Sequence, residues 1–159
     1  MGVRISAVVC THNRADYLRK ALRSLVDQSL PKDQYEIMVV DNGSTDRTAE
    51  VARSHGATVI EESRRNIALA RNVGAREAKG LILVFVDADT YWPESVLYRI
   101  VDVMSDHRCI GGAVDTDYRP DRFAVKVYLC FWRIVGKLSR MAQGATQFCR
   151  ADTFSSLGG

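Results

Sequence analysis

The chain has 159 residues, enough for one domain with a buried core and too few for two ordinary domains. Apolar residues make up 47% and charged residues 26%, as in an average globular protein. The net charge is only +3, and no stripe of basic residues interleaved with aromatic ones occurs, which argues against a nucleic-acid-binding protein. No apolar run indicates a signal peptide or a membrane span, so we expect a cytoplasmic protein.

The elements predicted in chain order alternate between short apolar strands and amphipathic helices. Ser44 is a plausible N-cap and Gly56 a stop for the second helix, and Pro93 suits the first position of the fourth. The predicted strands span residues 5–10, 35–40, 57–61, 81–87 and 109–114. The predicted helices cover residues 18–26, 45–56, 67–80 and 93–104.

This alternation predicts an α/β fold, with a mostly parallel sheet flanked by helices. The strands are nearly continuous apolar runs, as expected where helices cover both faces of a sheet. In such folds ligands bind at the carboxyl ends of the strands, which here read CTHNR, DNGSTD and DADTYW. All three ends are polar, so they are the place to look for a binding site.

The four cysteines are far apart in the sequence and form no CxxC pair. This spacing argues against a zinc site or a disulfide framework, and we expect reduced thiols buried in the core. They are Cys10, Cys109, Cys130 and Cys149.

Asp87 and Asp89 end the most apolar strand, and in an extended chain their side chains point the same way. Two neighbouring carboxylates repel each other, and a hard cation such as Mg²⁺ or Mn²⁺ would relieve that repulsion. The alternative is that Asp89 caps the next helix while Asp87 merely ends the strand. A second pair of this kind, Asp115 and Asp117, also follows a strand.

Basic residues before the strand at 81–87 favour Asp87 and Asp89, rather than the second acidic pair, as the binding site. They are Arg64, Arg65, Arg71 and Arg76. Arg71 and Asn72 fall early in the third predicted helix, where the helix dipole favours anions. A bound phosphate would use both the helix start and the cation, whereas the alternative is a solvated arginine face.

Taken together, the ordered segments CTHNR, VVDNGSTD, RNIALARNVGAREAKG and VFVDADTYW resemble the family 2 glycosyltransferases, whose domain has the GT-A fold. The match is close from residue 5 to about residue 95 and loose beyond it. The resemblance implies one GT-A domain over residues 1–159. It also implies an inverting, metal-dependent transfer of a sugar from a nucleotide-diphosphate-sugar to an acceptor hydroxyl.

The resemblance also implies roles for individual residues. Thr11 matches the position beside the base, Asp41 and Asn42 match an acidic pair, and Arg71 lies near the phosphates. Asn42 replaces the second Asp, which leaves UDP-, GDP- and dTDP-linked donors open. Asp87 would contact the ribose or sugar, and Asp87 and Asp89 would hold Mg²⁺ or Mn²⁺. The full set of implied donor-binding residues is Thr11, Asn13, Arg14, Asp41, Asn42, Arg71 and Asp87.

The general base of inverting members is a downstream Asp or Glu, usually after a GGF-type stretch, and this chain ends in FSSLGG. We therefore expect a fragment truncated before its base, so that the catalytic residue lies beyond Gly159 and Asp152 is not the base. Asp115 and Asp117 are interpreted as loop residues near the acceptor, a glycan or a lipid-linked molecule. The alternative function is a nucleotide-sugar-binding module without turnover.

Residues 123–136, FAVKVYLCFWRIVG, predict a helix that is apolar but interrupted by Lys126 and Arg133. We expect it to lie in the core or to pack on further residues. The alternative is an interfacial helix that meets a membrane surface or a lipid-linked acceptor, placing the protein at the inner face of the membrane.

Two other enzyme classes fit the sequence less well. A phosphatase of the haloacid dehalogenase type has Thr or Val two residues after the second Asp, where this chain has Tyr91. A Rossmann oxidoreductase needs a glycine-rich turn after its first strand, and CTHNRADY has no glycine.

Overall fold

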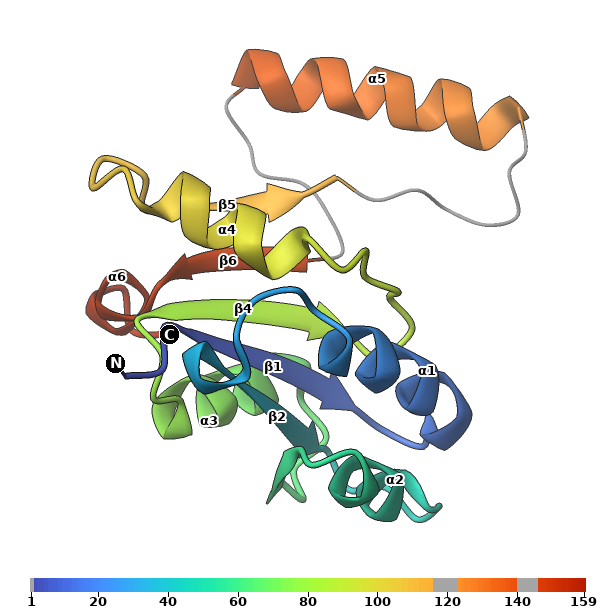
Figure 1. The fold of residues 1–159 in the computed structure, drawn as a ribbon. Coiled ribbons are helices and arrows are strands. Elements are labelled where there is room, and N and C mark those ends of the chain that lie inside the picture. The colour runs from blue at the N-terminus through green and yellow to red at the C-terminus, as the bar shows by residue number, and fades with distance from the viewer. Residues whose placement is uncertain (1, 116–122, 140–145) are drawn as a thin grey trace.

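The computed structural model describes residues 2–115, 123–139 and 146–159, which form one six-stranded sheet with helices on both faces (Figure 1). The strands are β1 (Ile5–Thr11), β2 (Tyr35–Asp41), β3 (Thr58–Glu61), β4 (Ile82–Asp87), β5 (Gly111–Val114) and β6 (Thr146–Arg150). The helices are α1 (Ala15–Val26), α2 (Thr48–Ser54), α3 (Ile67–Glu77), α4 (Val96–Met104), α5 (Phe123–Ser139) and α6 (Ala151–Ser156), with a 3-10 turn η1 (Lys32–Gln34).

The strand order is β3-β2-β1-β4-β6-β5. Strands β1 to β4 pair in parallel, and β6 runs antiparallel to both of its neighbours, β4 and β5. The predicted fold class, α/β with a mostly parallel sheet, is therefore confirmed. The sequence did not indicate β6, because TQFCR is short and has no apolar run.

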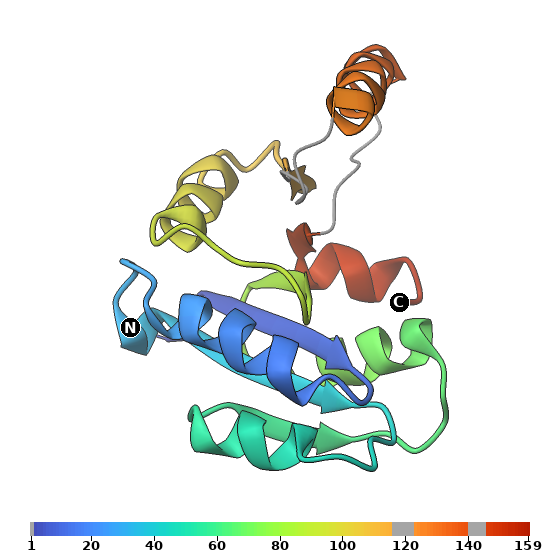
Figure 2. The same cartoon turned by 90° about the vertical axis from the view of Figure 1, so that its right-hand side faces the viewer.

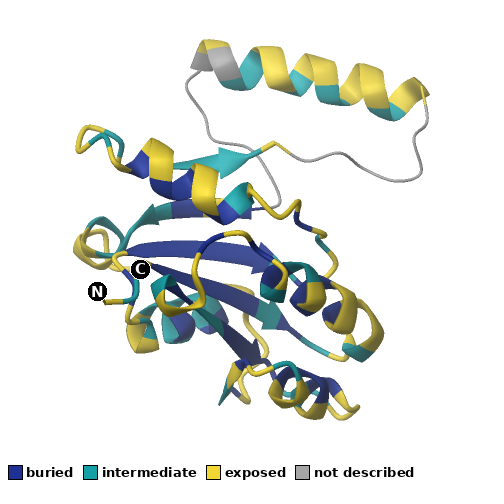
Figure 3. Ribbon diagram, viewed as in Figure 1, coloured by how far each residue is buried: buried dark blue, intermediate teal, exposed yellow. Residues whose placement is uncertain are grey.

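Two apolar layers cover the sheet, and Figure 2 shows helices on either side of it. Helices α1, α2 and α4 pack on one face around Leu18, Leu22 and Leu97, all fully buried. Helix α3 packs on the opposite face, and α6 joins it there through Phe154, whose ring lies 5.2 Å from that of Phe85. The central strands are buried on both sides (Figure 3), which explains their nearly continuous apolar sequences.

Three predicted helix boundaries are wrong. Helix α2 begins at Thr48 rather than at residue 45, and Asp46, not Ser44, accepts a hydrogen bond from the N–H of Thr48 at 3.0 Å. Pro93 starts a turn closed by the N–H of Val96, so α4 begins three residues after it. Helix α3 ends at Glu77, because the next residue is already extended.

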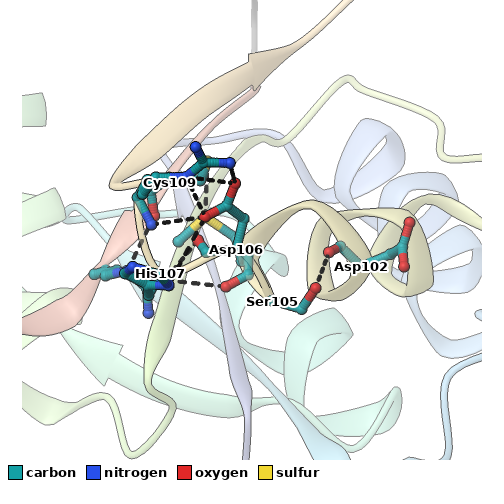
Figure 4. A network of polar contacts seen from close by, with 8 residues as sticks. Asp102, Ser105, Asp106, His107 and Cys109 are labelled. Carbon is teal, nitrogen blue, oxygen red and sulfur yellow. Dashed lines mark hydrogen bonds and ion pairs between the residues drawn. The ribbon is translucent and has the colours of Figure 1, made fainter.

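Arg150 fixes the far edge of the sheet. Its guanidinium donates to the backbone oxygens of Met104, Asp106 and Cys109 at 3.0, 3.1 and 3.0 Å. Asp106 in turn accepts hydrogen bonds from Arg108 (Figure 4). The last carbonyl of α4, that of Met104, thereby gains a partner, and the network joins this helix and the loop after it to β6.

Helix α5 projects away from the sheet (Figure 1), so it is not a core helix, and its packing on further residues stays a prediction. Six of its large apolar side chains remain exposed, and Cys130, predicted to be buried, is exposed as well, whereas the other three cysteines are half-buried. The exposed large apolar residues of α5 are Phe123, Val127, Tyr128, Phe131, Ile134 and Leu138. None of the helices described has the length and apolar character needed to cross a membrane.

Candidate functional site at the carboxyl edge of the sheet

The parallel register brings the ends of three strands to one edge. Thr11 of β1 lies opposite Asp41 of β2, and Cys10 lies opposite Asp87 of β4. A hollow of about 270 Å³, which we call the strand-end hollow, opens at this edge. It is lined by Cys10, Thr11, His12, Arg14, Asp87, Ala88 and Asp89.

Both carboxylates of the first acidic pair line the strand-end hollow, although not in the geometry expected from the sequence. Asp87 ends β4, but Asp89 lies in a turn in which the N–H of Thr90 donates to the carbonyl oxygen of Asp87 at 3.1 Å. Asp89 is exposed, and α4 begins only at Val96, so Asp89 does not cap that helix. A turn, rather than extended backbone, therefore places both side chains at the strand-end hollow.

The surroundings of Asp87 disfavour the charged form of its carboxyl group. Burial raises the pKa of the Asp87 carboxyl, the guanidinium of Arg71 lowers it, and the neighbouring Asp89 raises it again. The Arg71 nitrogen lies 3.6 Å from the Asp87 oxygen, and its guanidinium stands 5.9 Å from the centre of the Phe85 ring. A cation beside both carboxylates would favour their charged forms.

Two residues that line the strand-end hollow each carry an unsatisfied buried polar atom. The Thr11 hydroxyl and His12 Nδ1 have no hydrogen-bond partner within the described part of the chain. Buried polar atoms of this kind are rare in folded proteins, and a bound molecule would supply partners for them. The resemblance pointed to Thr11 but not to His12. The place of His12 in CTHNR, directly after a buried strand, was the signal that could have indicated it.

Asn13 joins the loops that follow β1 and β2. Its backbone is left-handed, with φ of 50°, its N–H donates to Ser44 Oγ at 2.9 Å, and its side-chain oxygen accepts from the N–H of Thr45 at 2.7 Å. Asp41 binds the same loop, because its carboxylate accepts from the N–H of Ser44 at 3.0 Å. Much of the oxygen-rich stretch DNGSTD therefore orders the loop itself.

Asn42 is buried, and the hydrogen bonds of its side-chain amide go to the backbone of residues 62–66. Its amide nitrogen donates to the carbonyl oxygens of Glu62 and Arg64 at 2.9 and 2.6 Å, and its amide oxygen accepts from the N–H of Asn66 at 3.1 Å. Arg64 itself forms an ion pair with Glu62 at 3.0 Å, as expected for a solvated arginine. The amide of Asn42 thus faces residues 62–66.

The carboxylate oxygens that line the strand-end hollow suit a hard cation that is bound together with a nucleotide. Asp87 and Asp89 supply oxygens, and no group of three or more metal-binding side chains occurs among the described residues. Two carboxylates leave coordination positions for phosphate oxygens and water, which is the usual arrangement for Mg²⁺ with a nucleotide. Asp115 is bound instead to Arg133 of α5 at 2.9 Å, and Asp117 lies outside the described residues.

The chain matches known proteins in sequence and in fold. The family model described as Glycosyl transferase family 2 matches residues 6–156. Glycosyltransferase AglE of Haloferax volcanii is 31% identical over 166 residues, which cover 97% of this chain and 55% of that protein.

Two solved structures share the fold. Mannosyltransferase PcManGT from Pyrobaculum calidifontis, in complex with GDP-Man and Mn²⁺, superposes with a TM-score of 0.82 at 26% identity, over 100% of this chain and 48% of that one. Staphylococcus aureus TarS 1–349 in complex with UDP-GlcNAc gives a TM-score of 0.65 at 26% identity, over 75% of this chain and 37% of that one. The chain thus spans about half the length of AglE and PcManGT.

Proposed function

Because the chain belongs to glycosyl transferase family 2, we propose that its strand-end hollow binds a nucleotide-diphosphate-sugar for transfer of the sugar to an acceptor hydroxyl. One observation carries this proposal: the residues that line the hollow include two carboxylates and two side chains with an unsatisfied buried polar atom, and Arg71 lies beside Asp87. The acceptor would be a glycan or a lipid-linked molecule.

The charges around the hollow suit the departure of a diphosphate. Breaking the sugar–phosphate bond leaves negative charge on the diphosphate, and the Arg71 guanidinium would stabilise that charge. Asp87 and Asp89 would hold Mg²⁺ or Mn²⁺, which supplies further positive charge to the leaving group when bound. Thr11 and His12 would donate to or accept from the nucleotide part of the donor.

We further propose that the transfer inverts the anomeric centre. Such a reaction needs a general base within hydrogen-bond reach of the acceptor hydroxyl, and none of the residues assigned here takes that role. Donor binding without turnover is the alternative function. Release of free nucleotide from the sugar nucleotide, with and without added acceptor, distinguishes the two.

Calorimetric titration of UDP, GDP and dTDP, each with Mn²⁺ and again with EDTA, tests donor binding directly. We expect one nucleotide to bind most tightly in the presence of Mn²⁺ and to lose at least about tenfold in affinity with EDTA, since a metal held by Asp87 and Asp89 would neutralise charge on the diphosphate. A folded chain that binds none of the three nucleotides, or binds them equally with EDTA, would contradict the proposal.

We also propose that α5 lies on an anionic membrane surface. Its exposed side chains at residues 123, 127, 131, 134 and 138 recur at helical spacing and form one apolar stripe. The helix sequence contains Lys126, Arg133 and Lys137 but no Asp or Glu. A helix of this kind binds membranes through apolar burial together with attraction to anionic lipid.

Co-sedimentation with vesicles tests the membrane proposal. We expect the chain to bind phosphatidylglycerol-containing vesicles and the double variant Phe131→Glu, Ile134→Glu to lose at least about tenfold in binding, since two charges would enter the apolar layer. Tyr98→Glu on α4, equally exposed, is the matched control and should bind as the wild type does. Equal binding by all three proteins, or a dimer without vesicles that the double variant disrupts, would refute it.

A further inference from the structure

We infer that Asn42 is a positioning residue, which sets the place of Arg71 through residues 62–66 and the start of α3, and does not read the nucleobase. The inference rests on the proposed function for its effect on binding. It concerns the position where the family resemblance expects a second Asp. The contacts of Asn42 follow one another along the chain from β2 to the strand-end hollow.

The first link is the amide of Asn42. Both of its donated hydrogen bonds end on backbone carbonyls, those of Glu62 and Arg64, and its oxygen accepts from the N–H of Asn66. Because this side chain is buried and its N–H groups are used, a nucleobase could gain donors from it only by breaking these bonds. A carboxylate here could keep the bond to Asn66 but could not donate to the two carbonyls.

The second link is Asn66, which begins α3. Its side-chain oxygen accepts from the N–H groups of Ala68 and Leu69 at 2.9 and 3.1 Å, so it caps the helix. Its carbonyl oxygen accepts from the N–H of Ala70 at 2.9 Å. Since the N–H of Asn66 is bonded to Asn42, the first turn of α3 is anchored to the end of β2.

The third link is Arg71, which follows the first turn of α3 and reaches Asp87 across the edge of the sheet. Gly74 already sets how closely this helix approaches the sheet, since a Cβ there would lie 2.4 Å from Val8 Cγ1. Asn42 and Asn66 set where the helix begins. A shift of that start would move the guanidinium away from Asp87 and from a diphosphate at the strand-end hollow.

Nucleotide titrations of Asn42→Asp separate positioning from base reading. We expect the affinities for Mn²⁺-UDP and Mn²⁺-GDP to fall by one common factor, about tenfold, because the displaced group binds the phosphates common to both. In an Arg71→Ala background the same change should have no further effect, since the two residues act in series. A changed ratio of UDP to GDP affinity, or an undiminished effect in the Arg71→Ala background, would overturn the inference.

Hydrogen exchange gives a readout that needs no ligand. We expect Asn42→Asp to speed exchange of the amides at residues 62–72 at least about tenfold. Gln28→Glu is the matched control, because the Gln28 amide is also buried, donates to the carbonyls of Ser24 and Pro93, and accepts from the N–H of Leu97. It should leave exchange at residues 62–72 unchanged.

The nucleotide titration and the hydrogen-exchange measurement can each give a negative result independently of the other. If the wild-type chain binds neither nucleotide, the proposed function fails while exchange still tests the anchoring of α3. If exchange at residues 62–72 is the same in Asn42→Asp and in the wild type, Asn42 does not position α3, whatever the chain binds.

Discussion

Replacing Asp89 by Asn is expected to lower the affinity for a nucleotide diphosphate in the presence of Mn²⁺ by about a hundredfold, the order lost when one preorganised charge contact is removed. Asp89 lines the strand-end hollow and is exposed, so the change should leave the fold intact. Titration calorimetry measures the affinity, and thermal unfolding checks the fold. With EDTA the variant and the wild type should bind the nucleotide equally weakly, since only the metal contact is removed.

The matched control is Asp115→Asn, which removes a carboxylate from the second acidic pair. Asp115 is bound to Arg133 of α5, so its loss should change nucleotide affinity by less than about twofold. Asp117→Asn makes the same comparison at a position outside the described residues. Equal losses in Asp89→Asn and in either control would rule out our assignment of the metal site.

The largest effect on stability is expected from Gly80→Ala, which should lower the free energy of unfolding by about 3 kcal/mol. A Cβ at residue 80 would lie 2.5 Å from the backbone nitrogen of Ser6 and 2.6 Å from the carbonyl carbon of Ile5. Neither atom can move without disturbing the start of β1. The N–H of Gly80 also donates to the Ser6 hydroxyl at 2.8 Å, and this buried bond would be strained as well.

Thermal unfolding should show this loss as a fall in midpoint of roughly 6–12 °C for a domain of this size. Gly2→Ala is the control, because a Cβ there would meet nothing within 4 Å. Its midpoint should match that of the wild type. If Gly80→Ala unfolds within about 1 °C of the wild type, the close approach of the chain at residue 80 to β1 is not a determinant of stability.

The strand ends could be located from the sequence because their signal is local. Apolar runs that end in CTHNR, DNGSTD and DADTYW indicated a parallel sheet with polar groups at one edge, and the register places Thr11 opposite Asp41 and Cys10 opposite Asp87. The sequence also pointed to Arg71, which lies 3.6 Å from Asp87. These positions follow from strand and helix periodicity together with the rule that parallel strands share a carboxyl edge.

Side-chain partners could not be predicted in the same way, because they depend on contacts between segments far apart in the sequence. The amide of Asn42 bonds to carbonyls 20 and 22 residues away, which no local pattern indicates. The short strand β6 acquires its structure by pairing with β4 and β5. The apolar sequence of α5 indicated a helix but not its exposure, because apolar spacing alone does not say whether protein or another surface covers it.

The position of Mn²⁺ in crystals grown with the bound nucleotide, located by anomalous diffraction, tests the central claim most directly. We predict one anomalous peak at the strand-end hollow, beside Asp89 and the phosphate oxygens, with Arg71 beside the diphosphate. A nucleotide bound with its metal elsewhere would contradict it. Examples are the hollow between Lys32 and His55 at the opposite end of the strands, or Asp115, which is bound to Arg133 of α5.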